Sequence, residues 1–280
     1  MGRWLLINTS LERTVNRQVL AAWTKHRAYP FAISASAVLF VLLIWWLVTR
    51  LQWVNPLFIP APGKVWIAFV QILQDGYKGS SLSHHIGDSL FRLGSAFALA
   101  LVTAIPLGLI SGSSLTVRSL VDPFIEFYRP LPPLAYYTML VLWLGIGDSS
   151  KIALLFLAAF APLYIAVVAG VRRVSADRIH AAKSLGASKI KLFIYVLFPS
   201  ALPEIFTGIR TAIGVSYTTL VAAEMVAAMS GIGWMVLDAS KFLRSDIIFA
   251  GIIIMGLIAL LIDSALRWLE KKLVPWSGKE

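Results

Sequence analysis

The chain has 280 residues, of which 58% are hydrophobic and 14% are charged, and its formal net charge is +11. Soluble domains carry roughly 25% charged residues, so this chain lacks the polar surface that a water-soluble fold needs. Its basic residues lie in short segments between apolar runs, which is typical of an integral membrane protein and argues against nucleic acid as a partner. Since the chain has no cysteine, it has no disulfide framework and no cysteine-based metal site or nucleophile.

Residues 1–30 predict an amphipathic helix. Leu11, Val15, Val19 and Trp23 recur every four residues, and basic and polar residues occupy the positions between them. A basic amphipathic helix of this kind lies in the plane of the membrane interface. An ordinary solvated helix is the alternative. No apolar run here is long enough for the h-region of a cleavable signal peptide.

Six segments are long and apolar enough to cross a membrane, which takes about 20 residues of helix. They are residues 31–49, 93–110, 130–147, 152–171, 205–228 and 247–266. A seventh apolar run, residues 65–73, is too short to span and has one apolar helical face, so it predicts an interfacial helix. The predicted fold class is an all-α integral membrane protein with six transmembrane helices.

Six spans place both ends of the chain on one side of the membrane. That side holds the N-terminus, residues 111–129, residues 172–204 and the tail, which together carry 17 Lys and Arg residues, whereas the other side carries seven. The excess of positive charge identifies the first side as cytoplasmic. The predicted organisation is a cytoplasmic segment 1–30, a six-helix domain 31–270 with a cytoplasmic loop 172–204, and a cytoplasmic tail 271–280.

The loop between the fourth and fifth spans predicts a helix-turn-helix. Ser175 or Asp177 can cap a first short helix. Gly186 follows where a residue with positive φ is needed to end it. Ser188 can then cap a second helix, which Pro199 would end. The alanines of the first helix leave room for another protein to approach closely.

This loop resembles the signature of the permease subunits of ATP-binding-cassette (ABC) importers, which reads E-A-A, three residues, G, nine residues, I-x-L-P. The matching positions are His180, Ala181, Ala182, Gly186, Val196, Phe198 and Pro199. His180 departs from the usual acidic residue and removes one ion-pair partner for the ATPase. Further segments match in order from about residue 55 onward. Together "EFYRPLPPLAY", "VLWLGIGDSSKI", "FPSALPEIFTGIR", "TTLVAAEMVAA" and "GIGWMV" resemble the nitrate, sulfonate and taurine branch.

The resemblance implies a type I ABC importer permease fold in the bacterial inner membrane, with both termini cytoplasmic. It implies as partners a second copy of the permease, two cytoplasmic ATP-binding subunits, a periplasmic substrate-binding protein and membrane lipid. The loop would be the coupling helix that docks on the ATPase. The residues expected to carry that contact are Asp177, His180, Ala181, Ala182, Leu185, Gly186 and Ala187. The chain itself has no Walker phosphate loop, so it is expected not to be an enzyme and to bind no cofactor, with ATP and Mg²⁺ on the partner.

Three charged residues lie within the spans, where each costs a few kcal/mol on insertion scales. Arg210 and Glu224 are fourteen residues apart, roughly 21 Å along a helix, so they cannot pair with one another. Arg210 is expected to snorkel to the interface. Glu224 is expected to make a hydrogen-bonded contact at the outer mouth or the subunit interface, with a substrate contact as the alternative. Asp263 has Arg267 four residues on, which predicts an ion pair at the helix end.

The segment "YRPLPPLAYY" predicts a break in the helix, because its prolines remove backbone donors. Irregular backbone at membrane depth is tolerated where it lines a cavity. A cytoplasmic elbow with Arg129 on lipid phosphate is an equal alternative. The candidate pathway residues are Tyr128, Arg129, Tyr136 and Glu224.

Small residues recur in the second and fifth spans and predict close helix packing. They are Gly94, Ala96, Ala98, Ala100, Gly208, Gly214, Ala222 and Ala223. His84 and His85 have no third ligand in view, so no metal site is expected.

The expected substrate is a small sulfonate, taurine, with aliphatic sulfonate, nitrate or bicarbonate as alternatives. A channel or a lipid enzyme is disfavoured, because the sequence has no filter-like repeat and no convergent charges.

Overall fold

The computed structural model of the chain describes residues 32–276. The chain divides into two compact units, Met1–Lys64 and Val65–Glu280. The described part of the first unit holds the apolar helix Ala32–Arg50, whose side chains are mostly exposed, and an irregular segment after it. The indole Nε1 of Trp45 donates a hydrogen bond to the carbonyl oxygen of Pro60 (3.0 Å) within this unit. The helix predicted in residues 1–30 lies outside the described residues.

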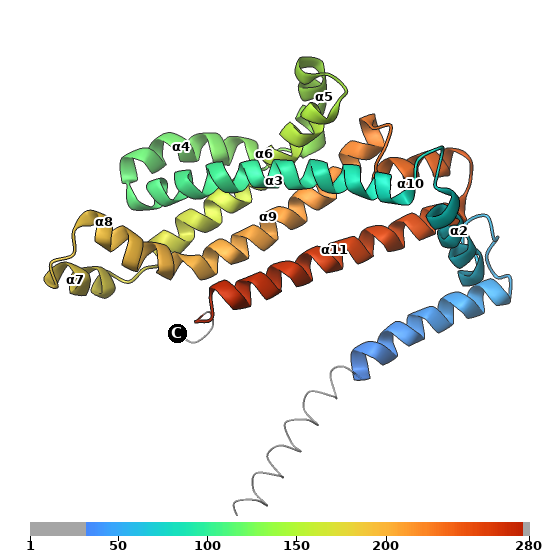
Figure 1. The fold of residues 1–280 in the computed structure, drawn as a ribbon, viewed down its shortest axis with the longest axis horizontal. Coiled ribbons are helices and arrows are strands. Elements are labelled where there is room, and N and C mark those ends of the chain that lie inside the picture. The colour runs from blue at the N-terminus through green and yellow to red at the C-terminus, as the bar shows by residue number, and fades with distance from the viewer. Residues whose placement is uncertain (1–31, 277–280) are drawn as a thin grey trace, which may run out of the picture. The chain divides into compact units, whose positions relative to one another are not determined.

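The second unit is built on long helices that run beside one another (Figure 1). They are α3 (Leu82–Ser113), α6 (Asp148–Arg172), α9 (Phe198–Ala227) and α11 (Ser245–Leu273). Shorter helices lie at the two ends: α2 (Pro62–Asp75) and α10 (Ile232–Lys241) at one, α7 (Ala176–Ser184) and α8 (Lys189–Leu192) at the other. A helix predicted at 65–73 is present as α2; its place at the membrane interface stays a prediction.

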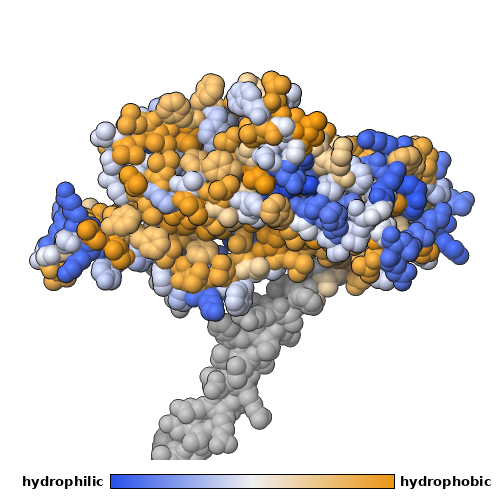
Figure 2. Space-filling view, turned by 45° about the horizontal axis from the view of Figure 1, so that its top comes forward, coloured by the Kyte–Doolittle hydropathy of each residue, from blue (hydrophilic) through white to orange (hydrophobic). Residues whose placement is uncertain are grey.

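Five described helices are long and apolar enough to cross a membrane, one in the first unit and four in the second. Hydrophobic residues cover the middle of the face in Figure 2, and hydrophilic residues gather at its two ends. Exposed apolar side chains in such a belt contact lipid rather than water. The predicted fold class, an all-α integral membrane protein, is confirmed.

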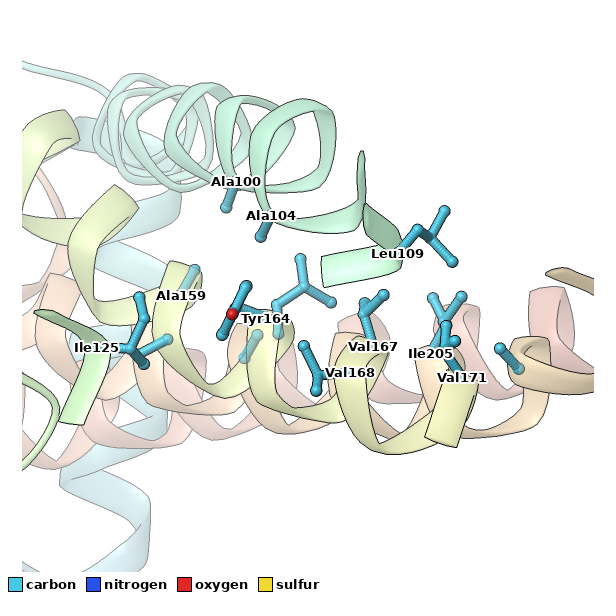
Figure 3. Close-up of a cluster of buried hydrophobic side chains, with 14 of the residues drawn as sticks. Ala100, Ala104, Leu109, Ile125, Ala159, Tyr164, Val167, Val168, Val171 and Ile205 are labelled. Carbon is cyan, nitrogen blue, oxygen red and sulfur yellow. The ribbon is translucent and has the colours of Figure 1, made fainter. Parts of the chain in front are cut away.

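The core of the second unit forms where α6 packs between α3 and α9. A Cβ on Gly108 of α3 would lie 2.7 Å from the Cβ of Val167, and one on Gly208 of α9 would lie 2.3 Å from the Cβ of Ala166. These two glycines therefore set how closely the three helices approach. Around them lie the buried side chains of one cluster, of which Figure 3 labels Ala100, Ala104, Leu109, Ile125, Ala159, Tyr164, Val167, Val168, Val171 and Ile205.

Close packing through small residues was predicted for the second and fifth spans, and it holds for some of those residues. Ala96, Ala100 and Ala223 are fully buried. Gly94 and Gly214 pack against no other part of the described chain, because an added Cβ would meet nothing within 4 Å. These two glycines face outward, which the spacing of small residues alone did not distinguish.

The third predicted span differs most from the sequence expectation. Residues 111–129, expected as a loop, contain α4 (Leu115–Tyr128), which Ser114 caps by accepting a hydrogen bond from the N–H of Val117. The expected span 130–147 contains only α5 (Pro133–Leu144), which Gly145 ends with φ of +82°. Twelve helical residues reach about 18 Å, so α5 alone does not cross a hydrocarbon core of about 30 Å. The helical structure is interrupted between α4 and α5, where the prolines remove backbone donors.

The prediction that Pro199 ends the second helix of the loop is wrong. Helix runs without interruption from Lys189 to Ala227, through α8, the π-helical turn η1 (Phe193–Leu197) and α9. The N–H of Phe198 donates to the carbonyl of Phe193, five residues back. This wider turn rearranges the hydrogen-bond ladder next to Pro199, so the missing N–H of the proline falls in the first turn of α9 and is tolerated.

Candidate functional site

The helix-turn-helix of the sequence analysis is present at one end of the long helices (Figure 1). Ser175 caps α7 by accepting from the N–H of Arg178 (3.4 Å), and Ser188 caps α8 by accepting from the N–H of Lys191 (3.4 Å). Gly186 has φ of +78°. Both predicted caps and the predicted glycine conformation are confirmed.

A Schellman motif ends α7. The N–H of Gly186 donates to the carbonyl of Lys183 (2.9 Å), and the N–H of Ala187 donates to the carbonyl of Ala182 (3.0 Å). This pairing satisfies carbonyls that a helix end would otherwise leave open. It also fixes the turn so tightly that a β-branched residue at position 186 would be strained.

No residue of α7 is buried, although most of the molecule around it is helix packed on helix. Leu185 exposes 89% of its surface, and Asp177, His180, Ala181 and Gly186 are also exposed. Ala182 and Ala187 are half-buried against the rest of the turn. The loop therefore presents a small, rigid surface with an apolar leucine at its tip, which suits docking against another protein.

The break between α4 and α5 opens onto a cavity of ≈ 430 Å³. Side chains of α6 and α9 form the other walls, and three candidate pathway residues, Tyr128, Arg129 and Tyr136, line it. Tyr128 is held there by a hydrogen bond from its hydroxyl to the carbonyl of Leu157 (3.4 Å). Of the two interpretations of the proline segment, the cavity is the one that the geometry supports.

Arg129 lies where this cavity meets a second one of ≈ 220 Å³, which is lined by charged groups including Arg118 and Asp122. Within residues 32–276, no ion pair or hydrogen bond involves the Arg129 guanidinium. An Arg that is not engaged by a carboxylate keeps its fork of donors open for an anion. The two cavities share Arg129 and Ile165 as lining residues, so they adjoin there.

Glu224, the fourth candidate, is not among the residues that line either cavity. It is 1% exposed and accepts hydrogen bonds from Ser89 Oγ (2.8 Å), Arg92 Nη1 (2.8 Å) and the N–H of Gly233 (2.9 Å). The predicted hydrogen-bonded contact is therefore present, and it lies within one subunit.

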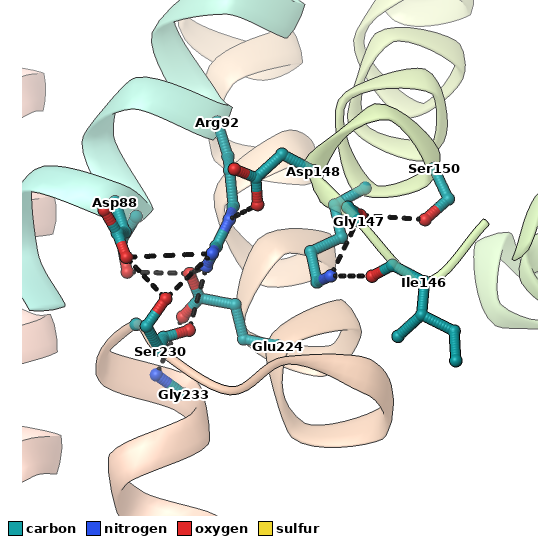
Figure 4. Close-up of polar contacts among 12 residues, drawn as sticks. Asp88, Arg92, Ile146, Gly147, Asp148, Ser150, Glu224, Ser230 and Gly233 are labelled. Atoms are coloured by element: carbon teal, nitrogen blue, oxygen red, sulfur yellow. Dashed lines mark hydrogen bonds and ion pairs between the residues drawn. The ribbon is translucent and has the colours of Figure 1, made fainter. Parts of the chain in front are cut away.

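Arg92 joins the ends of several helices (Figure 4). Its Nε donates to Asp148 at the start of α6 (2.7 Å), and its Nη1 donates to the carbonyl of Ser230 in the α9–α10 connection (2.9 Å). Ser230 also bonds Asp88 of α3. A Cβ on Gly231, which has φ of +112°, would lie 2.3 Å from Glu224 Oε1, so only glycine fits beside this carboxylate. Arg92 directly precedes the predicted second span, 93–110, and its pairing with Glu224, 132 positions away, was not predicted.

At the other end, Arg210 does not merely snorkel. Its Nε lies 3.2 Å from Asp263 Oδ1, and its Nη1 lies 3.8 Å from Glu270 of α11. The predicted Asp263–Arg267 pair is present at 2.7 Å. Arg210 thus ties α9 to α11, a contact between distant segments that local spacing could not reveal.

The fold and these two regions define a class: a multi-span α-helical membrane protein with a lined cavity between its helices and an exposed helical turn at one end. The model of the family described as "Binding-protein-dependent transport system inner membrane component" matches residues 104–275. The chain therefore belongs to this family of ABC importer permeases, in the branch that holds taurine, sulfonate and nitrate permeases.

Several relatives support this assignment. The chain is 44% identical to the taurine transport system permease protein TauC of Escherichia coli over 98% of both chains. It is 33% identical to the nitrate import permease protein NrtB of Synechocystis over 88% of this chain and 90% of the relative. A solved structure of the MetNI methionine ABC transporter, in inward-facing conformations, matches with a TM-score of 0.59 and 15% identity, covering 68% of this chain and 95% of that one. This last likeness shows the fold alone.

Proposed function

We propose that this permease moves a small sulfonate, taurine, into the cytoplasm. The observation that carries the proposal is the cavity at the break between α4 and α5, where an unengaged Arg129 lies with two tyrosines. The likeness to a taurine permease along nearly the whole chain supports it. Aliphatic sulfonate, nitrate and bicarbonate are the alternative substrates, and a nitrate permease is among the relatives.

The cavity offers taurine a partner for each end. A sulfonate carries three acceptor oxygens on a tetrahedral sulfur, and a guanidinium such as that of Arg129 can bind two of them in a bidentate manner. An ammonium group is stabilised by the face of an aromatic ring, and Tyr128 and Tyr136 supply two. Because Glu224 is hydrogen-bonded to Arg92, it is not a partner for the ammonium group. Nitrate and bicarbonate would need only the anion half of this arrangement.

The cavity opens toward a stripe of small and hydroxyl-bearing residues on the exposed face of α9. Thr207, Thr211 and Val215 line the cavity, and Gly214 and Thr218 continue the stripe. A second copy of the permease facing this stripe would close the pathway on its open side. The mass of the intact assembly tests this, and a single permease copy would contradict it.

Energy for transport would come from two cytoplasmic ATP-binding subunits, on which ATP and Mg²⁺ bind, while this chain binds no cofactor. Asp177, His180, Leu185 and the small residues between and after them would dock there. A periplasmic binding protein would deliver substrate to the opposite end. This arrangement places the protein in the bacterial inner membrane, with segment 1–30, loop 172–204 and tail 271–280 in the cytoplasm.

The experiment is uptake of labelled taurine by cells that lack any other taurine route. Arg129→Gln should reduce uptake about 10- to 100-fold, since a hydrogen bond to a charged group contributes about 1.5–3 kcal/mol. Lys241→Gln, an exposed cation at the other end, is the matched control and should leave uptake unchanged. Full uptake by Arg129→Gln would refute the role of the cavity. If the unmodified chain restores growth on nitrate or an alkyl sulfonate but not on taurine, the substrate assignment is wrong.

A further inference from the structure

The exposed face of α11 carries an apolar stripe that ends in basic side chains. Leu257, Leu260 and Leu261 expose 53%, 65% and 70% of their surface. Seven residues beyond Leu260 and Leu261 come Arg267 and Trp268, and four further on come Lys271 and Lys272. Spacings of seven and four keep side chains on one face of a helix. The stripe therefore changes along one line from an aliphatic part to an end that is both aromatic and cationic.

A cleft of ≈ 430 Å³ lies at the cationic end of the stripe. Its walls combine the last turns of α11 with one residue of α9, and they are Arg210, Arg267, Glu270, Lys271, Val274 and Pro275. Asp263 and Glu270 are the carboxylates in contact with these cations. Three cations facing two carboxylates leave the cleft with net positive charge.

The guanidinium groups in the cleft are held in place, and some of their N–H donors remain open. Arg210 and Arg267 each direct Nε to the carboxylate of Asp263, at 3.2 Å and 2.7 Å. An arginine has five N–H donors, so this contact leaves the terminal N–H groups of Arg267 for another acceptor. Asp263 thus orients the two arginines, and the position of their remaining donors is fixed by the two helices.

Trp268 lies at the aromatic and cationic end of the stripe. It is 63% exposed, and Lys272 Nζ lies 5.2 Å from the centre of its ring. Tryptophan is enriched at the level of lipid headgroups, where its ring meets both the apolar and the polar layer. Trp268 and the basic side chains therefore lie together at one end of the aliphatic stripe, as the headgroup region of a phospholipid lies at one end of its acyl chains.

We propose that the α11 stripe and its cleft form a binding site for one anionic phospholipid. The phosphodiester would be held by Arg267 and Lys271, and an acyl chain would lie along Leu257, Leu260 and Leu261. The continuous apolar stripe favours a lipid over a soluble acidic peptide, because a peptide would leave the leucines without a partner. Basic clefts between helices at the cytoplasmic side of a membrane bind such headgroups. The choice of that leaflet rests on the proposed orientation, while the binding itself requires no transport.

The test measures lipid retained by the purified full-length permease in its native assembly, by mass spectrometry, after exchange into detergent with phosphatidylglycerol or phosphatidylcholine. We expect retention of phosphatidylglycerol in preference to phosphatidylcholine. Each basic side chain near an anionic lipid contributes roughly a fivefold gain in affinity, so Arg267→Gln with Lys271→Gln should weaken binding about 25-fold. Lys189→Gln with Lys191→Gln is the matched control, since it removes the same charge from exposed positions away from the stripe. It should retain the lipid.

Three results would overturn the proposed lipid site. The first is equal retention of both lipids by the unmodified protein. The second is a loss of lipid by the control variant, Lys189→Gln with Lys191→Gln, as large as that of the α11 variant, Arg267→Gln with Lys271→Gln, and the third is no loss by the α11 variant. A chain that ends at Trp276 tests a further occupant, residues 277–280, which include one acidic residue, Glu280. If the full chain binds no phosphatidylglycerol and this shorter chain does, the tail fills the cleft and the lipid proposal is refuted.

Discussion

Gly208 sets the distance between α6 and α9. Comparing alanine substitutions at Gly208 and at Gly214, both on α9, tests this role. A Cβ at position 208 would come within 2.3 Å of the Cβ of Ala166, whereas one at Gly214, also on α9, would meet nothing within 4 Å. Ordinary contact between such atoms begins near 3.4 Å. Gly208→Ala therefore forces α6 and α9 apart by about 1 Å or distorts one of them, and overpacking of this kind costs about 1–3 kcal/mol.

Both substitutions gain the same helix propensity, about 1 kcal/mol for Gly to Ala, so this contribution cancels in the comparison. Gly214→Ala should be neutral or stabilising, and Gly208→Ala should be less stable than Gly214→Ala by about 1–3 kcal/mol. The assay is the midpoint of heat-induced loss of folded protein in detergent, measured side by side for the two variants. Equal midpoints would refute the claim that Gly208 sets the helix spacing, because only the local clash distinguishes the two positions.

Three further results are expected. Glu224→Ala should destabilise the protein by about 3 kcal/mol, since it leaves the buried Arg92 without one of its carboxylates; thermal stability in detergent measures it. Gly186→Val should leave the protein in the membrane and abolish transport, because valine is strained at positive φ; membrane fractionation and uptake measure it. Burial and the hydrogen bond to Asp238 raise the pKa of Tyr77. The stability that Tyr77 adds relative to Tyr77→Phe should be constant below the ordinary tyrosine pKa of about 10 and fall as pH rises above it.

Each of these expectations has its own control. Glu224→Gln keeps acceptors for Ser89 and Arg92 and should lose less stability than Glu224→Ala, so equal losses would contradict the role of the hydrogen bonds. Gly186→Asn tolerates positive φ and should keep transport; if it fails as Gly186→Val does, backbone strain is not the cause. A difference between Tyr77 and Tyr77→Phe that is unchanged from neutral pH to pH values well above 10 would show that the tyrosine hydroxyl adds nothing.

Local sequence signals predicted the ends of helices well, because caps depend on neighbours only a few residues away. Ser175, Gly186 and Ser188 all act as expected. Pro199 led to a wrong prediction, because a proline usually ends a helix. Nothing in the local sequence indicates that a π-helical turn will accommodate it. The rule of about 20 apolar residues likewise assumes continuous helices. It therefore treated residues 111–129, which contain α4, as a loop, and assigned a full span to residues 130–147, of which only Pro133–Leu144 is helical.

The candidate site was predictable only in part. Tyr128, Arg129 and Tyr136 are adjacent along the chain, so their common place at one cavity follows from the break beside them. Glu224 was grouped with them because a buried charge looks functional in isolation. Its partner Arg92 lies on another helix, and a contact of that kind depends on how α3 packs against α9. The same holds for Arg210 and Asp263.

The uninterrupted helix from Lys189 to Ala227 has a mechanical consequence. No loop separates the exposed turn at α7 and α8 from the cavity wall at Thr207, and the two lie about 27 Å apart at 1.5 Å per residue. If this continuous helix moves as a rigid body, a tilt of about 10° at the turn shifts the cavity wall at Thr207 by about 5 Å over that length. The π-helical turn and Pro203 are irregular points along that segment, so the stiffness of the helix there sets how much of a displacement at the turn reaches the cavity.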